Sequence, residues 1–164
     1  MRARLLFASL LALVAASAAA QTARVDPLLA VHETDPLELA HAVDRLGDAA
    51  IVERLGEGTP IAVRALAVAA TPRLHQPEQA LAPLAAIAQG RDPDLAPRAA
   101  QAALTIATSL DERTLDAHEV DRAELTPART ALAAIAADAT ARADLRRAAG
   151  RADAALADLG IPEP

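Results

Sequence analysis

The feature that most constrains this chain is a helix-start signal that recurs at an almost constant interval. It appears as Thr59-Pro60, Asp92-Pro93 and Thr126-Pro127, with the prolines 33 and 34 residues apart. A Thr or Asp oxygen accepts a hydrogen bond from a backbone N–H at the start of a helix, and proline at the first helical position lacks a donor that would have no partner there. Because recurrence at this interval is typical of helical repeats, the chain is expected to fold as an α-solenoid.

The composition beyond residue 20 points to the same fold class. That part of the chain lacks Lys, Asn, Cys, Met, Phe, Tyr and Trp, and it is rich in alanine. Alanine and arginine favour helices, whereas the aromatic residues that favour strands are missing. We therefore predict an all-α protein, built as a short right-handed α-solenoid of stacked antiparallel helical hairpins.

Residues 1–20 have the pattern of an N-terminal signal peptide. Two arginines lie within the first four residues, residues 5–16 are apolar and residues 17–20 are small. Cleavage is expected between Ala20 and Gln21. The alternative is an uncleaved membrane anchor, but the apolar run is shorter than the roughly 17 to 25 residues that span a bilayer. The sequence thus predicts a periplasmic or secreted protein.

Charge and residue types limit the partners. All 22 acidic residues but only 14 of the 16 arginines follow residue 20, so the processed chain of 144 residues has a formal charge of −8. That charge repels nucleic acid and anionic lipid, and without aromatic side chains there is no stacking platform for bases. The absence of cysteine excludes disulfides. We expect a protein or peptide partner, with no nucleic acid, no stable membrane span and no cofactor.

The helical repeat domain is expected to occupy residues 35–160. Residues 21–34 lack a clean hydrophobic period and are interpreted as a flexible leader or as a short helix at Asp26-Pro27. Residues 161–164 end the chain with two prolines and are expected to be a frayed tail.

Within the domain, the apolar spacing predicts successive helical pairs. Asp35-Pro36 starts a first hairpin, whose first helix is expected to end at Gly47. The helix that begins at Thr59-Pro60 is expected to pair with a helix over residues 76–89. Pro83 and Pro97 fall inside predicted helices, where they bend the helix unless it begins later than the pattern indicates.

Residues 111–124 interrupt the pattern, because they carry six acidic residues against two arginines. They are expected to form a short helix followed by a loop, before a final helix over residues 141–159. The side chains whose truncation to alanine should be most costly, at roughly 2 to 4 kcal/mol each, are Leu66, Leu84, Ile106 and Ile135.

Three segments resemble HEAT repeats, including the short HEAT-like repeats of bacteria. Residues 59–67 and 92–100 are similar to the first helix of that family, with a turn Thr or Asp, a proline, and then Arg64 or Arg98 among alanines. Residues 80–88 are similar to its second helix. In the third unit the arginine stands at a different offset from the proline. The resemblance implies a curved stack of helical hairpins that contacts other proteins and has no chemistry of its own.

Two groups of side chains have the chemistry of metal ligands. They are Glu38, His41 and Asp44 at helical spacing, and Asp116, His118 and Asp121. A solvated helix face or a set of ion pairs gives the same spacing, and we prefer that interpretation. Ser109, at the end of an apolar helix, is expected to stabilise a turn rather than to act as a nucleophile. No catalytic, cofactor-binding or metal-binding residue is therefore predicted.

The leading hypothesis for function is a non-catalytic scaffold for protein–protein interaction. The alternatives are an enzyme similar to the HEAT-like lyases that attach or isomerise bilin chromophores, and a structural subunit of an envelope assembly. The acidic residues 111–124 are the best candidate contact for a basic partner, although a solvated insertion explains them too.

Overall fold

The computed structural model describes residues 25–163, and every regular element in that range is a helix. The all-α prediction is therefore confirmed for the described part of the chain. The predicted signal peptide of residues 1–20, with its cleavage point at Ala20 and Gln21, lies outside the described residues. In chain order the elements are the α-helices and 3-10 helices (η) η1 Pro27–Ala30, α2 Pro36–Leu46, α3 Asp48–Glu53, α4 Ile61–Ala70, η2 Thr71–Arg73, η3 Pro77–Ala80, α5 Leu81–Gln89, α6 Leu95–Ser109, α7 Glu112–Ala117, η4 Arg122–Leu125, α8 Thr126–Ala137 and α9 Ala143–Asp158.

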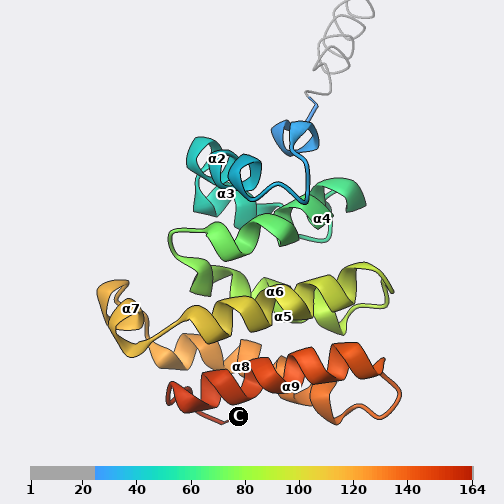
Figure 1. The fold of residues 1–164 in the computed structure, drawn as a ribbon. Helices are drawn as coiled ribbons and strands as arrows, with labels where there is room; N and C mark the ends of the chain where they lie inside the picture. The colour runs from blue at the N-terminus through green and yellow to red at the C-terminus, as the bar shows by residue number, and fades with distance from the viewer. Residues whose placement is uncertain (1–24, 164) are drawn as a thin grey trace, which may run out of the picture.

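The most extensive packing joins α5, α6, α8 and α9. Helix α5 packs against α6 and α8 packs against α9, while α5 also contacts α8 and α6 contacts α9. Figure 1 shows α5 and α6 lying between α4 on one side and α8 with α9 on the other. The two pairs therefore lie one upon the other, and each helix of one pair faces a helix of the other.

The predicted pairing of the helix after Thr59-Pro60 with the helix over 76–89 is wrong. Helix α4 packs mainly against α6, η1 and α2, whereas α5 packs mainly against α6 and α8. The connections explain the difference. Residues 71–80, with two 3-10 helices, separate α4 from α5, but only residues 90–94 separate α5 from α6. A short connection favours antiparallel neighbours, so α5 and α6 form the hairpin.

The start of α2 follows the predicted capping chemistry. Asp35 Oδ1 accepts hydrogen bonds from the backbone N–H groups of Leu37 at 2.9 Å and Glu38 at 3.2 Å, and Pro36 occupies the first helical position. The helix ends at Gly47, whose φ of 81° is readily adopted by glycine. Both boundaries were correctly indicated by local sequence.

The three recurring start signals are not equivalent in the structure. Asp92 stands two residues before the N-cap Asp94, and its Oδ1 accepts from the N–H groups of Leu95 at 2.8 Å and Asp94 at 3.0 Å, which lowers the pKa of the Asp92 carboxyl. Thr59 and Thr126 make no side-chain cap bond: α4 begins after Pro60, and α8 continues from η4 with Pro127 in its first turn. The prediction is therefore correct for the Asp92 side chain, but Pro93 lies before α6, which begins at Leu95, and the capping prediction is wrong for the two threonines.

The third signal also opens a helix in a different packing position. Helices α4 and α6, which follow the first two signals, contact each other, and α6 contacts α9. Helix α8, which follows Thr126-Pro127, instead contacts α5 and α9. The near-constant interval between the prolines thus does not mark three equivalent helices.

Both internal prolines lie in the first turn of their helices. Pro83 is the third residue of α5 and Pro97 is the third residue of α6. A proline is tolerated there because its missing N–H has no intrahelical acceptor. The alternative that these helices begin later than the hydrophobic pattern indicates is confirmed.

The core runs through the described helices and is rich in alanine. Leu84, Ile106 and Ile135 are buried as predicted, whereas Leu66 is only partly buried at the edge of the core. On α4 the inward positions belong to Val63, Ala67, Val68 and Ala70. No helix in the described range is long and apolar enough to cross a membrane.

The core also extends beyond the predicted domain limits at both ends. Residues 25–34 include η1, and the side chain of Leu28 is 0 % exposed, so this part of the predicted flexible leader is packed against the domain. At the other end Ile161 is 2 % exposed, and its carbonyl accepts a hydrogen bond from Arg129. The prediction of a frayed tail is therefore wrong for Ile161.

Candidate functional site

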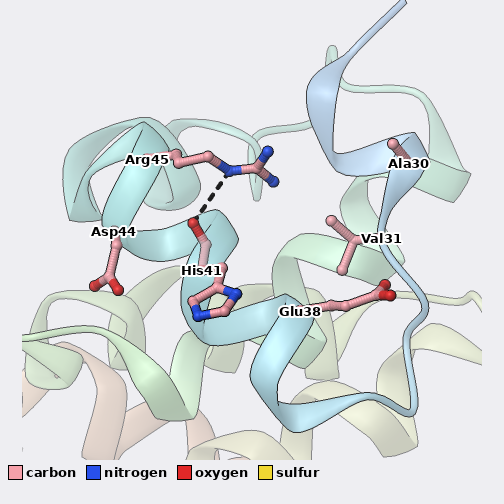
Figure 2. Close-up of a pocket in the computed structure, with 6 residues that line it drawn as sticks. All are labelled: Ala30, Val31, Glu38, His41, Asp44 and Arg45. Carbon is pink, nitrogen blue, oxygen red and sulfur yellow. Dashed lines mark hydrogen bonds between the residues drawn. The ribbon is translucent and has the colours of Figure 1, made fainter.

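The first candidate ligand group, on α2, does not converge. Glu38 Oε2 accepts a hydrogen bond from the His32 N–H at 2.7 Å and lies 3.0 Å from His32 Nδ1. These two contacts, the backbone bond first, lower the pKa of Glu38. Figure 2 shows the side chains of Glu38, His41 and Asp44 pointing in different directions around an open cavity.

Asp44 and the exposed His41 are likewise not arranged for a shared ion. Asp44 Oδ1 lies 3.6 Å from His75 Nε2, on the side of the helix that faces the η2–η3 connection. The His41 backbone carbonyl accepts a hydrogen bond from Arg45 Nε at 3.2 Å, which Figure 2 marks. The arrangement is that of a solvated helix face with local ion pairs.

The second candidate group, around α7, separates in the same way. Asp121 Oδ1 accepts from the Ala123 N–H at 2.9 Å, which caps η4, whereas Asp116 Oδ1 lies 3.9 Å from Arg122 Nη2. His118 turns instead to Glu78, 40 residues earlier in the chain. Across residues 25–163, no three His, Cys, Asp or Glu side chains are grouped so that they could hold a metal ion.

Ser109 has the turn role expected of it. Its Oγ donates a hydrogen bond to the carbonyl of Ile106 at 2.8 Å, at the last turn of α6. The interaction is the common one for a serine at the end of a helix.

The contact between Glu78 and His118 lies at a pocket that sequence reasoning missed. Glu78 Oε1 and His118 Nδ1 are 3.1 Å apart, joining η3 to the C-terminal end of α7. Beside this pair is a cavity of about 330 Å³. Its lining residues come from η3, α5, the turn after α7 and η4, and they are Gln76, Glu78, Gln79, Ala82, His118, Glu119, Val120, Glu124 and Leu125.

Glu78 is the unusual member of this lining. Its side chain is 4 % exposed, and among the described residues none provides a hydrogen-bond partner for its Oε2. A buried carboxylate oxygen without a donor costs free energy, of the order of 1 to 3 kcal/mol or more for a charged group. The Oε2 atom is itself fully buried, so it does not open onto the cavity, and the rest of the Glu78 side chain lines the cavity wall.

The backbone holds the rim of the pocket in a defined shape. Glu119 has a φ of 54°, in the left-handed region that residues with a side chain seldom adopt. The turn is closed by hydrogen bonds from the Glu119 N–H to the Asp116 carbonyl at 3.1 Å and from the Val120 N–H to the Leu115 carbonyl at 3.0 Å. This turn ends α7 and sets His118 and Glu119 side by side at the cavity.

The electrostatic character of the pocket is acidic. Besides Glu78, it is lined by Glu119 and Glu124, both on the exposed surface. The nearest arginine in sequence, Arg122, donates through its Nε to the Leu159 carbonyl at 3.2 Å and is therefore directed to the C-terminal end of α9. Three carboxylates around one cavity attract a cation and repel an anion.

The arginines of the predicted repeats have separate structural roles. Arg64 donates through Nη2 to the carbonyl of Gly56, which precedes α4. Arg98 forms an ion pair with Glu33 on the surface. Neither contacts the pocket. Arg64 and Arg98 therefore do not make equivalent contacts in the two predicted repeats.

Two other cavities lack the features of the Glu78 pocket. One of about 380 Å³ lies between α4 and α6 and is lined mostly by small apolar side chains, with Glu33 and Arg98 at its edge. Another of about 740 Å³ lies at the ends of α5 and α8 and is open to solvent. Neither is lined by a buried carboxylate, so the Glu78 pocket is the strongest candidate site.

Comparison of the chain with known protein families, with curated proteins and with solved structures gives no match.

Proposed function

We propose that this protein is an exported, non-catalytic scaffold that binds another protein or peptide, and that its helices form a short HEAT-like right-handed solenoid. Support for the solenoid comes from the packing of the α5–α6 pair on the α8–α9 pair, with α4 against α6. Helical pairs stacked in this way bury a continuous core and leave elongated surfaces for contact.

The observation that carries the proposed binding role is the acidic surface around Glu78. Residues 111–124 bring the exposed Glu119 and Glu124 to the rim of the cavity, and the buried Glu78 lies beside it. Surfaces of one charge sign steer and select partners of the opposite sign. A basic segment of a partner protein fits this chemistry best.

Export is proposed on the pattern of residues 1–20. The test is N-terminal sequencing of the protein purified from the envelope and from the medium of cells that make it. A mature N-terminus at Gln21 in either fraction supports export, whereas an intact Met1 in the cytoplasmic fraction alone contradicts it.

The binding role is tested by site-specific photo-crosslinking. A photoreactive amino acid replaces Glu119 at the rim of the pocket, and a matched control places it at Glu57, an exposed glutamate in the loop before α4. The proposal expects one protein to be crosslinked from position 119 and not from position 57, and to bind the purified chain when it is purified in turn. The same crosslinked products from both positions, or none from position 119, would contradict it.

A further inference from the structure

We infer that copies of this protein associate head to tail, with the N-terminal end of one helical stack against the C-terminal end of the next. Figure 1 shows η1, α2 and α3 at one end of the stack and α8 with α9 at the other. The two ends differ in their exposed apolar side chains and in their charge. Such self-association goes beyond the proposed binding of another protein and does not depend on it.

In the described part of the chain, large apolar side chains are exposed only near the N-terminal end of the stack. They are Val25, Leu29, Leu37 and Ile61, and Leu37 is the most prominent helical one, at 70 % exposed. The elements that carry the last three contact one another, since η1 and α2 both pack against α4. Terminal units of a helical stack normally need a polar outer face. An apolar end therefore indicates a surface that another protein molecule covers.

Helix α2 has an exposed stripe that combines an apolar with a charged side chain. Leu37, His41 and Asp44 are exposed and follow one another at intervals of four and three residues, which places them on one side of the helix. The opposite side, with Leu39 and Val43, is buried. Beside the stripe opens the cavity of about 340 Å³ shown in Figure 2. Since α2 packs mainly on α3, α4 and η2, the stripe is left for contact with another molecule.

Charge also separates the two ends. Residues 25–61, which include η1, α2 and α3, hold eight acidic residues and two arginines, a formal charge of −6. Residues 126–158, which form α8, α9 and the loop between them, hold five arginines and four acidic residues, a formal charge of +1. Surfaces of opposite sign attract each other and set the orientation of a complex. The second end of the stack is thus a suitable partner for the first.

Two arginines of α9 are available for such a contact. Arg147 and Arg151 are exposed and lie four residues apart on one side of the helix. Neither forms an ion pair with a described residue. Of the three acids of α9, Asp144 and Asp153 are paired with arginines from outside the helix, and Asp158 is its last residue. The positive charge of this helix is therefore directed to solvent.

The two ends fit each other better than two N-terminal ends do. Two N-terminal ends brought together would oppose their acidic residues, whereas a C-terminal end supplies cations to the same surface. Between its charges α9 exposes Ala143 and Ala154, against which a large side chain such as Leu37 can pack. The overall negative charge of the chain opposes association only weakly, because salt at about 0.15 M screens charges more than about 8 Å apart. Contact between unlike ends is heterologous, so it can extend from copy to copy.

The test is sedimentation velocity of the protein purified from the cells that make it, at concentrations up to about 200 µM. The weight-average sedimentation coefficient should rise with concentration and should pass the value of a dimer, because each added copy leaves one free end of each kind. Raising the salt from about 0.1 M to about 0.5 M should reduce association, since exposed ion pairs are screened.

Charge reversal at each end identifies the surfaces in contact. The N-terminal variant is Asp44→Arg with Glu53→Arg, and the C-terminal variant is Arg147→Glu with Arg151→Glu. All four side chains are exposed. Each variant alone should associate about tenfold more weakly, because it places like charges opposite each other. An equimolar mixture of the two variants should recover the association, since their reversed ends attract each other and their unreversed ends do so as before.

Two further variants separate charge from apolar contact. Arg91→Glu with Arg113→Glu makes the same change of charge at exposed arginines in the middle of the stack, and it should change association by no more than about twofold. Leu37→Gln keeps the charge and removes an exposed apolar side chain, and it should weaken association by about threefold to tenfold. Circular dichroism at 222 nm establishes that each variant is folded.

Several results would overturn the inference. These are a protein that stays monomeric at every concentration, a plateau at the dimer, or an equal loss of association in the control at Arg91 and Arg113. A mixture of the two end variants that does not recover association would also overturn it. Loss in the N-terminal variant with none in the C-terminal variant would indicate contact between two N-terminal ends and reject the head-to-tail arrangement. If one end variant does not fold, the other is compared with the control, and equal association in those two rejects the contact.

Discussion

Arg129 is expected to hold the C-terminal segment onto the last two helices. Its side chain is 10 % exposed, and it donates through Nε to Asp153 Oδ1 at 3.1 Å, through Nη1 to the Ile161 carbonyl, and through Nη2 to Glu163 Oε1 at 3.3 Å. One guanidinium thus joins α8 to α9 and to the residues that follow α9. Replacing it with methionine keeps most of the apolar stem and removes all three donors.

The size of the effect follows from what Arg129→Met leaves unpaired. The Ile161 carbonyl is buried, and an unsatisfied buried acceptor costs about 1 to 3 kcal/mol. Asp153 and Glu163 are 28 % and 83 % exposed, so water replaces much of what they lose. We therefore expect a loss of about 3 kcal/mol in the free energy of unfolding, at the lower end of the roughly 3 to 5 kcal/mol for breaking a buried pair.

The assay is urea unfolding followed by circular dichroism at 222 nm. Two controls separate the contributions. Asp153→Asn keeps the size of the side chain and should lower the free energy of unfolding by about 1 kcal/mol. Arg147→Ala removes an exposed arginine from α9, the helix that carries Asp153, and should change the free energy of unfolding by no more than about 0.5 kcal/mol. A loss below about 1 kcal/mol in Arg129→Met, or a loss equal to that of Arg147→Ala, would refute the reasoning.

Three further perturbations test other parts of the fold. Leu84→Ala should cost about 2 to 5 kcal/mol in urea unfolding because its side chain is 0 % exposed, whereas the partly buried Leu66→Ala should cost about 1 to 2 kcal/mol. Gly47→Ala should lower the free energy of unfolding by about 1 kcal/mol, since φ is 81° there. The hydrogen bond and charge of Asp48 raise the pKa of His75 above 6.5, so Asp48→Asn should lower it in an NMR titration. The His75 contribution to stability should be present below about pH 6.5 and should disappear as the pH rises through the raised pKa, so a His75→Gln difference that persists at pH 9 would contradict it.

Local signals in the sequence predicted the helices better than their partners. The boundaries of α2 followed from an aspartate, a proline and a glycine that act within a few residues, and the structure agrees at both ends. The pairing of α5 depended on the length of the connections and on which apolar face meets which. Alanine-rich helices are poor guides to that choice, because many of their faces are equally apolar and equally small.

The candidate site could not be predicted from the sequence for a related reason. Glu78 follows Pro77 and has the pattern of an acidic residue in the first turn of a helix. Nothing in that pattern connects it with His118, and the two meet only because the α5–α6 hairpin brings η3 close to the end of α7. The acidic segment itself was recognisable, since its charge departs from the helices on both sides.

The Asp48–His75 contact shows the same dependence on tertiary packing. His75 Nδ1 lies 3.0 Å from Asp48 Oδ1, and the Gln76 N–H donates to Asp48 Oδ2 at 2.7 Å, which joins α3 to the connection before η3. Burial is the largest influence on Asp48 and opposes its charge, but the hydrogen bonds from His75 and Gln76 outweigh it and lower the pKa of Asp48. The pair therefore stabilises this connection most between about pH 4 and pH 6.5.

The arginines of this chain supply cohesion that its alanine core cannot. Burying alanine removes little apolar area from water, so each such position contributes little at about 25 cal/mol per Å². Against this, four arginines donate to backbone carbonyls at least 32 residues away in sequence: Arg73 to Pro36, Arg122 to Leu159, Arg129 to Ile161 and Arg142 to Pro93. Three of these carbonyls lie outside the helices, at Pro93, Leu159 and Ile161, and the fourth belongs to Pro36 at the start of α2. Guanidinium can make such a bond and keep further donors for a carboxylate, as Arg129 and Arg142 both do, whereas an ammonium group is a single compact charge. Beyond residue 20 the chain contains arginine and no lysine. Four of these arginines join segments that are distant in the sequence, so the choice of arginine has a structural role here.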